Sequence, residues 1–123
     1  MKLANNLYTL AALDTRGVAA SVRLCPGSVI YRSHFPEMPV TPGVCVIQMA
    51  TELLEQLTGR SLELAEVKNA KFLAVINPEA MQEVNYTFQK TTADESTGIL
   101  TTSATVSSGE TVCAKLSLRY KTA

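Results

Sequence analysis

The spacing of apolar residues predicts one long helix. From Pro42 to Thr58 the chain is rich in apolar and helix-forming residues, and Gly59 is suited to end the helix in a left-handed conformation. Three polar residues, Gln48, Glu52 and Glu55, recur at i, i+4 and i+7 and form one polar stripe. The first turn is apolar on nearly all sides and is therefore expected to be buried, through Val44, Cys45, Val46 and Ile47.

Strands are predicted on both sides of this helix. Residues 7–13 form an apolar strand or short helix, and the alternation from Val18 to Leu24 indicates a half-buried strand that a turn at Pro26-Gly27 ends. After Arg60, Ala65 to Val75 is a candidate strand. Further strands follow where apolar and polar residues alternate, at Val84, Tyr86 and Phe88, at Leu100, Thr102, Ala104 and Val106, and at Val112, Ala114, Leu116, Leu118 and Tyr120.

These elements indicate a single fold class. Polar stretches at 93–96 and 107–110 are the connections expected of hairpins. One long helix and five or six strands, with no alternation of helix and strand, predict an α+β fold with an antiparallel sheet. With 123 residues, the chain is expected to form a single domain spanning residues 1–123.

A proline-rich segment, S-H-F-P-E-M-P-V-T-P-G, connects the first strands to the helix. Prolines at every third position fix φ and bias the preceding residues away from helix, which predicts a stiff, extended loop leading on from residues 29–31. Thr41 is expected to cap the helix and Pro42 to be its first residue. This loop carries His34, the only histidine, close to a helix start where unpaired N–H groups and the dipole favour negative charge.

An imidazole beside a helix start suits proton transfer next to a carbonyl group. Imidazole exchanges a proton near neutral pH, and the helix N–H groups can stabilise the enolate-like oxygen that forms when the α-proton is lost. The plainer alternatives are a packing or capping role for His34 and close backbone packing at Gly43. Cys45 also lies near the helix start, but in this apolar run a small core residue is favoured over a reactive thiolate.

Composition argues against several other classes of protein. Hydrophobic residues make up 46% of the chain and charged residues 18%, as in an ordinary globular protein, and the net charge of zero offers no attraction for nucleic acid. The three cysteines are odd in number and widely spaced, so neither a disulfide framework nor a metal site is expected. The beginning of the sequence does not resemble a signal peptide, and no apolar run approaches the roughly 18 residues of a membrane span. No membrane association and a cytoplasmic location are therefore expected.

The run His34-Phe35-Pro36, followed by Pro39, Pro42-Gly43 and an aliphatic helix, resembles the active-site segment of the 3-hydroxyacyl-ACP dehydratases of the FabZ/FabA type. That segment reads roughly H-F-P-G-H-P-x-x-P-G, with Glu or Asp five residues after the last Gly. Residues 67–72 and the closing strands are similar too, so the resemblance covers nearly the whole chain. It implies a hotdog fold, in which an antiparallel sheet wraps around one long central helix, and no metal or redox cofactor.

The resemblance also implies a reaction and roles for particular residues. His34 would remove the α-proton of a 3-hydroxyacyl thioester carried on acyl carrier protein, and the Gly43 N–H would polarise the thioester carbonyl. Loss of water would leave a trans-2-enoyl thioester. A homodimer is expected, because in this family the pocket lies between two subunits. Candidates for substrate binding are Phe35, Met38, Pro42 and Val44.

The chain departs from the family segment at two places, within the proline-rich loop and at the position of the family's catalytic acid. Glu37-Met38 replace Gly-His, and Gln48 replaces the catalytic acid. A carboxamide cannot act as an acid, although it can hydrogen-bond a water or a hydroxyl group. Glu52 stands one turn further on, about 6 Å along the helix, where FabZ-type sequences tend to have Gln. Gln48 or Glu52 would then orient the leaving hydroxyl group or a water, although a solvated position is the favoured alternative for Glu52.

Three functions stay open at this stage. The first is a dehydratase of fatty-acid or polyene-type biosynthesis, since aryl-polyene-type clusters also use small dehydratase-like hotdog proteins. The second is a non-catalytic subunit that completes a heterodimeric dehydratase with a paralogue. The third is an acyl thioesterase that relies on Glu52. Lys68 and Lys71 could contact an acidic carrier protein, but two merely exposed strand lysines are favoured.

Overall fold

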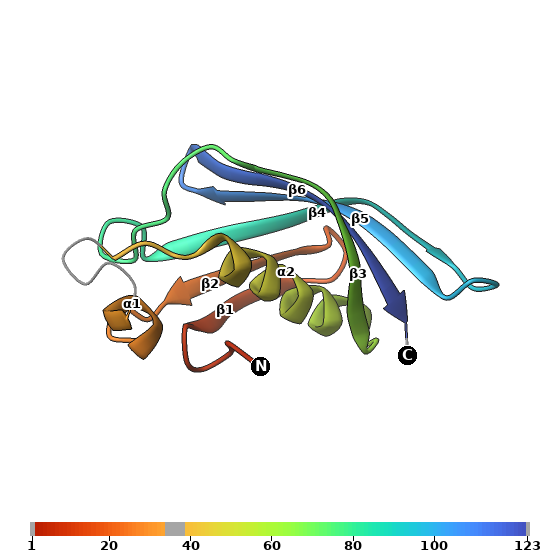
Figure 1. Ribbon diagram of the computed structural model, residues 1–123, viewed down its shortest axis with the longest axis horizontal. Coiled ribbons are helices and arrows are strands. Elements are labelled where there is room, and N and C mark those ends of the chain that lie inside the picture. The colour runs from red at the N-terminus through yellow and green to blue at the C-terminus, as the bar shows by residue number, and fades with distance from the viewer. Residues whose placement is uncertain (1, 34–38, 123) are drawn as a thin grey trace.

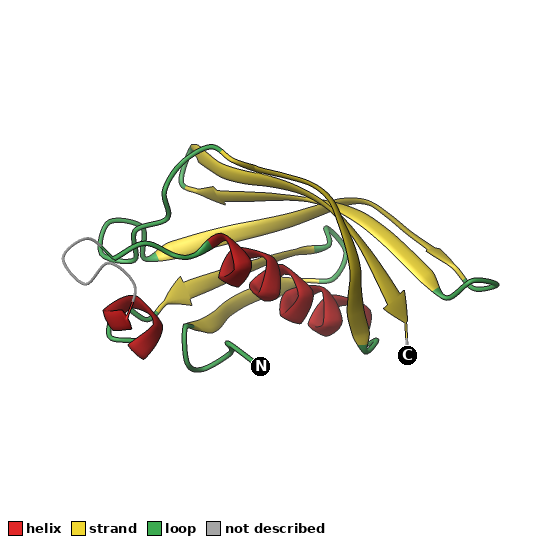
Figure 2. Cartoon of the chain, in the orientation of Figure 1, coloured by secondary structure: helices red, strands yellow, loops and turns green. Residues whose placement is uncertain are grey.

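The computed structural model describes residues 2–33 and 39–122. In this part, six strands form one sheet in the order β1-β2-β4-β5-β6-β3, and every neighbouring pair is antiparallel (Figure 1). Figure 2 shows the long helix α2 lying against one face of the strongly curved sheet. The expected α+β fold with an antiparallel sheet around one long helix is confirmed. The elements are β1 (Tyr8–Asp14), β2 (Ala19–Leu24), α1 (Val29–Ser33), α2 (Gly43–Thr58), β3 (Leu62–Phe72), β4 (Glu83–Asp94), β5 (Ile99–Ser108) and β6 (Thr111–Thr122).

The core lies between the inner face of the sheet and α2. The alternating apolar positions of β2, β4 and β5, and those of β6 from Ala114 on, are buried as expected, and α2 packs Val46, Met49, Ala50, Leu53 and Leu54 against them. A slip of one residue in any of these strands would turn its apolar set towards solvent, so burial specifies the register. The Tyr86 hydroxyl also donates a hydrogen bond to the Val46 carbonyl oxygen at 2.8 Å, which ties α2 to β4.

The C-terminal end of α2 agrees with the prediction from the sequence, whereas its N-terminal cap does not. Gly59 has φ 69°, and its N–H bonds to the Glu55 carbonyl oxygen at 2.9 Å, which confirms the expected left-handed end. The expected cap is wrong: Pro42 is the N-cap residue, and no side chain in the described part of the chain caps this end. The Thr41 hydroxyl group is instead paired with the Tyr31 hydroxyl group of α1, 2.8 Å away in a buried site.

One short helix was not expected, and two local expectations need correction. Residues 29–31, which lead towards the loop, form helix α1 together with Arg32 and Ser33. The third strand ends at Phe72 and not at Val75. Val112 is exposed whereas Cys113 is buried, because the pairing of β5 with β6 is irregular between Val106 and Ser107 and shifts the faces at the start of β6.

The strand β3 forms one edge of the sheet and, among the residues that the structure describes, pairs only with β6. Apart from Leu62 and the half-buried Ala70, its side chains are exposed, including the apolar Leu64, Val67 and Phe72. One side of this strand therefore presents unpaired backbone groups next to apolar side chains, which is the usual template for pairing with another chain.

Candidate functional site

The proline-rich loop is only partly described by the structure. Residues 34–38, with the expected base His34, the loop residue Glu37 and the expected substrate-binding residues Phe35 and Met38, lie outside the described residues. Their roles stay predictions. The described chain continues at Pro39 and enters α2 within four residues, so the loop is attached directly to the start of the helix.

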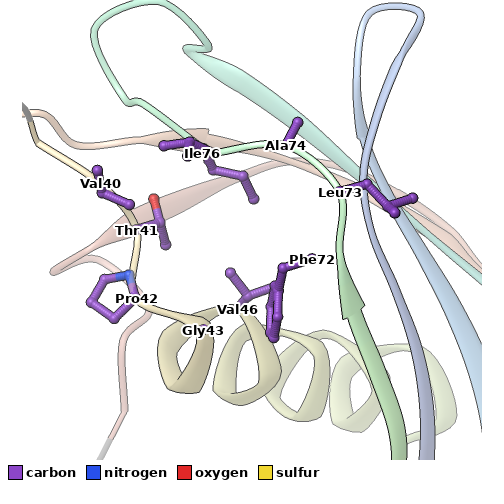
Figure 3. A pocket seen from close by; sticks show the side chains of 10 residues that line it. Val40, Thr41, Pro42, Gly43, Val46, Phe72, Leu73, Ala74 and Ile76 are labelled. Atoms are coloured by element: carbon purple, nitrogen blue, oxygen red, sulfur yellow. The ribbon is translucent and has the colours of Figure 1, made fainter.

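An apolar cavity of about 500 Å³ opens at the N-terminus of α2 (Figure 3). Residues 40–43 and Val46 line one wall, and the last residue of β3, Phe72, lines the other together with residues 73–76. The ring of Phe72 lies over the first turn of the helix, where a Cβ added to Gly43 would come within 2.9 Å of the Phe72 Cζ atom. The absence of a side chain at Gly43 therefore lets the aromatic ring approach the helix start.

The helix start brings free donor groups to the edge of this cavity. Cys45 and Val46 donate their N–H groups to the Pro42 carbonyl oxygen at 2.9 and 3.1 Å, and Pro42 itself has no N–H. Within residues 2–33 and 39–122, no atom accepts a hydrogen bond from the N–H of Gly43 or Val44. Together with the helix dipole, these two groups favour a partly negative oxygen at this place.

The side chain of Val44 corrects the expectation that the whole first turn is buried. Cys45 and Val46 are buried, but Val44 is 76% exposed. The sheet covers α2 on one side only, and Val44 lies on the side left open. Of the two expected substrate-binding residues that are described, Pro42 lines the apolar cavity and Val44 does not.

Glu52 is buried, with only 6% of the residue exposed, so the favoured solvated position is wrong. Its Oε2 atom accepts hydrogen bonds from the Leu3 N–H at 2.7 Å and from Gln48 Nε2 at 2.9 Å. Its Oε1 atom accepts hydrogen bonds from the Ala4 N–H and the Tyr8 hydroxyl group, each at 2.9 Å. The segment before β1 thus folds over the polar stripe of α2 and covers it.

These four contacts decide what the Glu52 carboxylate can do. Two backbone N–H groups and an amide NH₂ can only donate, so they require an acceptor. The Glu52 carboxylate is therefore committed to contacts within the protein. Glu52 lines a polar cavity of about 400 Å³ together with Lys2, Tyr8 and Glu55, whereas neither Glu52 nor Gln48 lines the apolar cavity.

Burial also changes the acidity of hydroxyl and thiol groups near α2. The pKa of Tyr8 is raised, first by burial and then by its hydrogen bond to Glu52. Burial raises the pKa of Tyr31 to about 12, although the hydrogen bond with Thr41 acts in the opposite direction. Burial raises the pKa of the Cys45 thiol, which therefore stays protonated, as favoured for a small core residue.

Other kinds of site find little basis in the described part of the chain. Among residues 2–33 and 39–122, no cluster of three or more His, Cys, Asp or Glu side chains is arranged to hold a metal ion. No helix there is both long and apolar enough to span a membrane. Lys68 and Lys71 are both exposed on β3.

Comparison with known proteins adds a family and one curated relative. The family model described as ApeI-like, ApeI dehydratase, matches residues 12–110. The 3-hydroxyacyl-[acyl-carrier-protein] dehydratase FabZ of Latilactobacillus sakei is 34% identical over 68 residues. This stretch is 50% of the chain and 49% of the relative, so the chain spans about half the length of the curated relative that it matches.

Solved structures of low sequence identity share the fold. The dehydratase heterocomplex ApeI:P of Xenorhabdus doucetiae matches with a TM-score of 0.68 at 17% identity, over 93% of this chain and 97% of that one. The protein smu.793 of Streptococcus mutans, bound to acetyl CoA, gives 0.65 at 10% identity over 98% and 91%. A putative thioesterase of Ralstonia eutropha gives 0.63 at 12% identity over 98% and 88%. These likenesses confirm the expected hotdog fold.

Proposed function

This chain belongs to the ApeI-like dehydratase family, and from that premise we propose that it removes water from a 3-hydroxyacyl thioester on acyl carrier protein. The observation that carries the proposal is the apolar cavity at the start of α2. Its walls suit an acyl chain, and its edge carries the Gly43 N–H, which has no acceptor among the described residues. A thioester carbonyl group at this place would be polarised as its α-proton leaves.

His34 alone can both remove and return the proton in this reaction. In the proposed reaction, His34 takes the proton from C2, and the negative charge that develops on the thioester oxygen is stabilised by the Gly43 N–H. The bond from C3 to its hydroxyl group then breaks, and the imidazolium returns its proton to the departing oxygen, which leaves as water. No carboxylic acid is required in this step. Gln48, which does not line the apolar cavity of its own subunit, would hydrogen-bond the hydroxyl group across a dimer.

We place this site in a homodimer. Support comes from the unpaired edge of β3 and from the exposed apolar Val44, Phe72 and Val75 beside the apolar cavity, which a second subunit would cover. A heterodimer with a paralogue that supplies an acid is the alternative, and Gln48 at the acid position favours it. The proposal further assigns the chain, as a single domain of the cytoplasm, to fatty-acid or polyene-type biosynthesis.

A thioesterase function has weaker support. Hydrolysis of a thioester in this fold would need a carboxylate that can reach the substrate, and Glu52 was the candidate for it. Its four hydrogen bonds commit Glu52 to the N-terminal segment and to Gln48. Release of a free thiol from acyl thioesters would contradict this reasoning, because dehydration leaves the thioester intact.

The test is the reversible hydration of a 2-enoyl thioester on acyl carrier protein by the wild type, His34→Ala and Gln48→Glu. We expect an active wild type and a loss of about a hundredfold or more in His34→Ala, the scale of general acid–base catalysis. A wild type and a His34→Ala variant of equal activity would refute the role of His34. An inert wild type with an active Gln48→Glu variant would replace the proposal by that of a subunit lacking its acid.

A further inference from the structure

We propose that Glu52 is a positioning residue that fixes the orientation of the Gln48 carboxamide, and that the segment before β1 contributes by holding Glu52. This inference rests on the proposed function where it lets Gln48 meet the substrate. The positioning itself is a property of the folded chain and can be measured without turnover.

The direction of the contact follows from the chemistry of the two groups. A glutamine amide can usually turn over and exchange its oxygen and nitrogen at little cost. Here Nε2 of Gln48 lies 2.9 Å from Oε2 of Glu52, and a carboxylate can only accept. The NH₂ group of Gln48 must therefore face Glu52, and its Oε1 atom is turned to the other side. Glu52 thereby selects one of the two amide orientations of Gln48, the one with the Oε1 acceptor on the side away from Glu52.

Glu52 is itself held by a preformed set of donors. Leu3 and Leu7 are fully buried, and the Leu3 carbonyl oxygen accepts the N–H groups of Asn6 and Leu7 at 3.0 and 2.8 Å. This turn is thus anchored without Glu52 and presents the successive N–H groups of Leu3 and Ala4 to the carboxylate. The Tyr8 hydroxyl group completes the set from the first residue of β1.

The pair also explains what an exchange of the two residues would do. In Gln48→Glu, two carboxylates would face each other at hydrogen-bond distance, and neither could donate to the other while both are charged. In Glu52→Gln, the amide would have to turn its own NH₂ group towards one of the existing donors. In the double variant Gln48→Glu/Glu52→Gln, that NH₂ group can donate to the new carboxylate, so one contact of the original pair is restored with its direction reversed.

The test combines a double-mutant cycle with NMR of the side-chain amide groups. Thermal unfolding of the wild type, both single variants and the double variant is compared at pH 8. We expect the melting temperature of the double variant to fall by less than the sum of the decreases in the two single variants. A loss equal to or greater than the sum would overturn the pairing of Gln48 with Glu52.

NMR measures the orientation directly. The Gln48 NH₂ signals are those that disappear in Gln48→Glu, and we expect them to shift in Glu52→Gln and in the milder Tyr8→Phe. They should stay in place in two matched controls, Glu110→Gln in an exposed turn and Tyr120→Phe, which loses a buried hydroxyl group that contacts Thr51. Unmoved Gln48 signals in Glu52→Gln would overturn the proposal.

Kinetics separates this inference from the proposed function. If the wild type hydrates 2-enoyl thioesters, Tyr8→Phe should lower kcat by about tenfold, with little change in KM, because a small displacement of a positioned group mainly affects the transition state. Equal rates in Tyr8→Phe and Tyr120→Phe would overturn the link from the N-terminal segment to Gln48. If the wild type is inert, the proposed function fails, whereas the NMR and thermal measurements still decide the positioning.

Discussion

Replacing Glu52 by alanine should destabilise this protein more than a loss from an exposed helix face would. The substitution removes the acceptor shared by four donors, of which the Leu3 N–H and the Tyr8 hydroxyl group are buried. The Ala4 N–H and the Gln48 amide are only partly buried and can turn to water. The cost therefore comes mainly from the two buried donors that are left without a partner.

Two routes give a similar size for this cost. A buried donor without a partner costs about 1–3 kcal/mol, so the two together cost roughly 2–6 kcal/mol. The chain could instead release the N-terminal segment and expose Leu3 and Leu7, whose burial contributes about 1.5–3 kcal/mol each. Both routes centre on a loss of about 4 kcal/mol, a large part of the usual stability of about 5–15 kcal/mol.

The assay is urea unfolding followed by circular dichroism, with the free energy of unfolding extrapolated to water. The matched control is Glu55→Ala, which removes a single partly buried hydrogen bond from the Leu62 N–H at 2.9 Å and should cost about 1 kcal/mol. Hydrogen exchange at Leu3 and Ala4 then reports whether the segment is released. If Glu52→Ala loses no more stability than Glu55→Ala, the burial argument for Glu52 is refuted.

Three further predictions follow from single contacts. Gly43→Ala should destabilise the wild type, because the new Cβ would lie 2.9 Å from the Phe72 ring. In a Phe72→Ala background, the same substitution should stabilise the protein by about 0.5–1 kcal/mol through helix propensity. A change of the same sign in both backgrounds, measured by urea unfolding, would contradict this. Burial raises the pKa of Tyr31 and Tyr120 from 10.0 to about 12, so the stability they contribute is present below pH 10 and is lost as pH rises towards 12. Phenolate absorbance from these two tyrosines near pH 10 in the folded protein would refute it. The Cys45 thiol, buried and with a raised pKa, should react with a thiol reagent far more slowly in the folded than in the unfolded protein, as peptide mapping would show.

Much of the fold was predictable because each inner strand has one buried face. In β2, β4 and β5, the alternating apolar residues seen in the sequence are the residues that face α2. The edge strand β3 shows no such alternation of burial, so its end was misjudged. The burial predicted for Val112 was wrong for another reason. A local irregularity in strand pairing shifts the faces of β6, and no residue type in the sequence marks it.

The candidate site, like the fold, was only partly predictable from the sequence. The motif from His34 to Gly43 identified the family, and the structure places Pro42 and Gly43 in the wall of an apolar cavity. The sequence did not indicate that residues 72–76 form the opposite wall. Nor did it indicate that Val44, in an apolar run, is exposed, since periodicity does not tell which side of a helix the sheet leaves open.

Glu52 shows most clearly what each level of information determined. The sequence by itself determined the helix, the spacing that puts Gln48 and Glu52 on one face, and the motif that marks the family. Only the tertiary structure decided that this face is covered. Two of the donors that hold Glu52 are backbone N–H groups 48 and 49 residues away, at Ala4 and Leu3. Every residue except proline carries such a group, so no sequence pattern reveals it, and only folding brings it to the carboxylate.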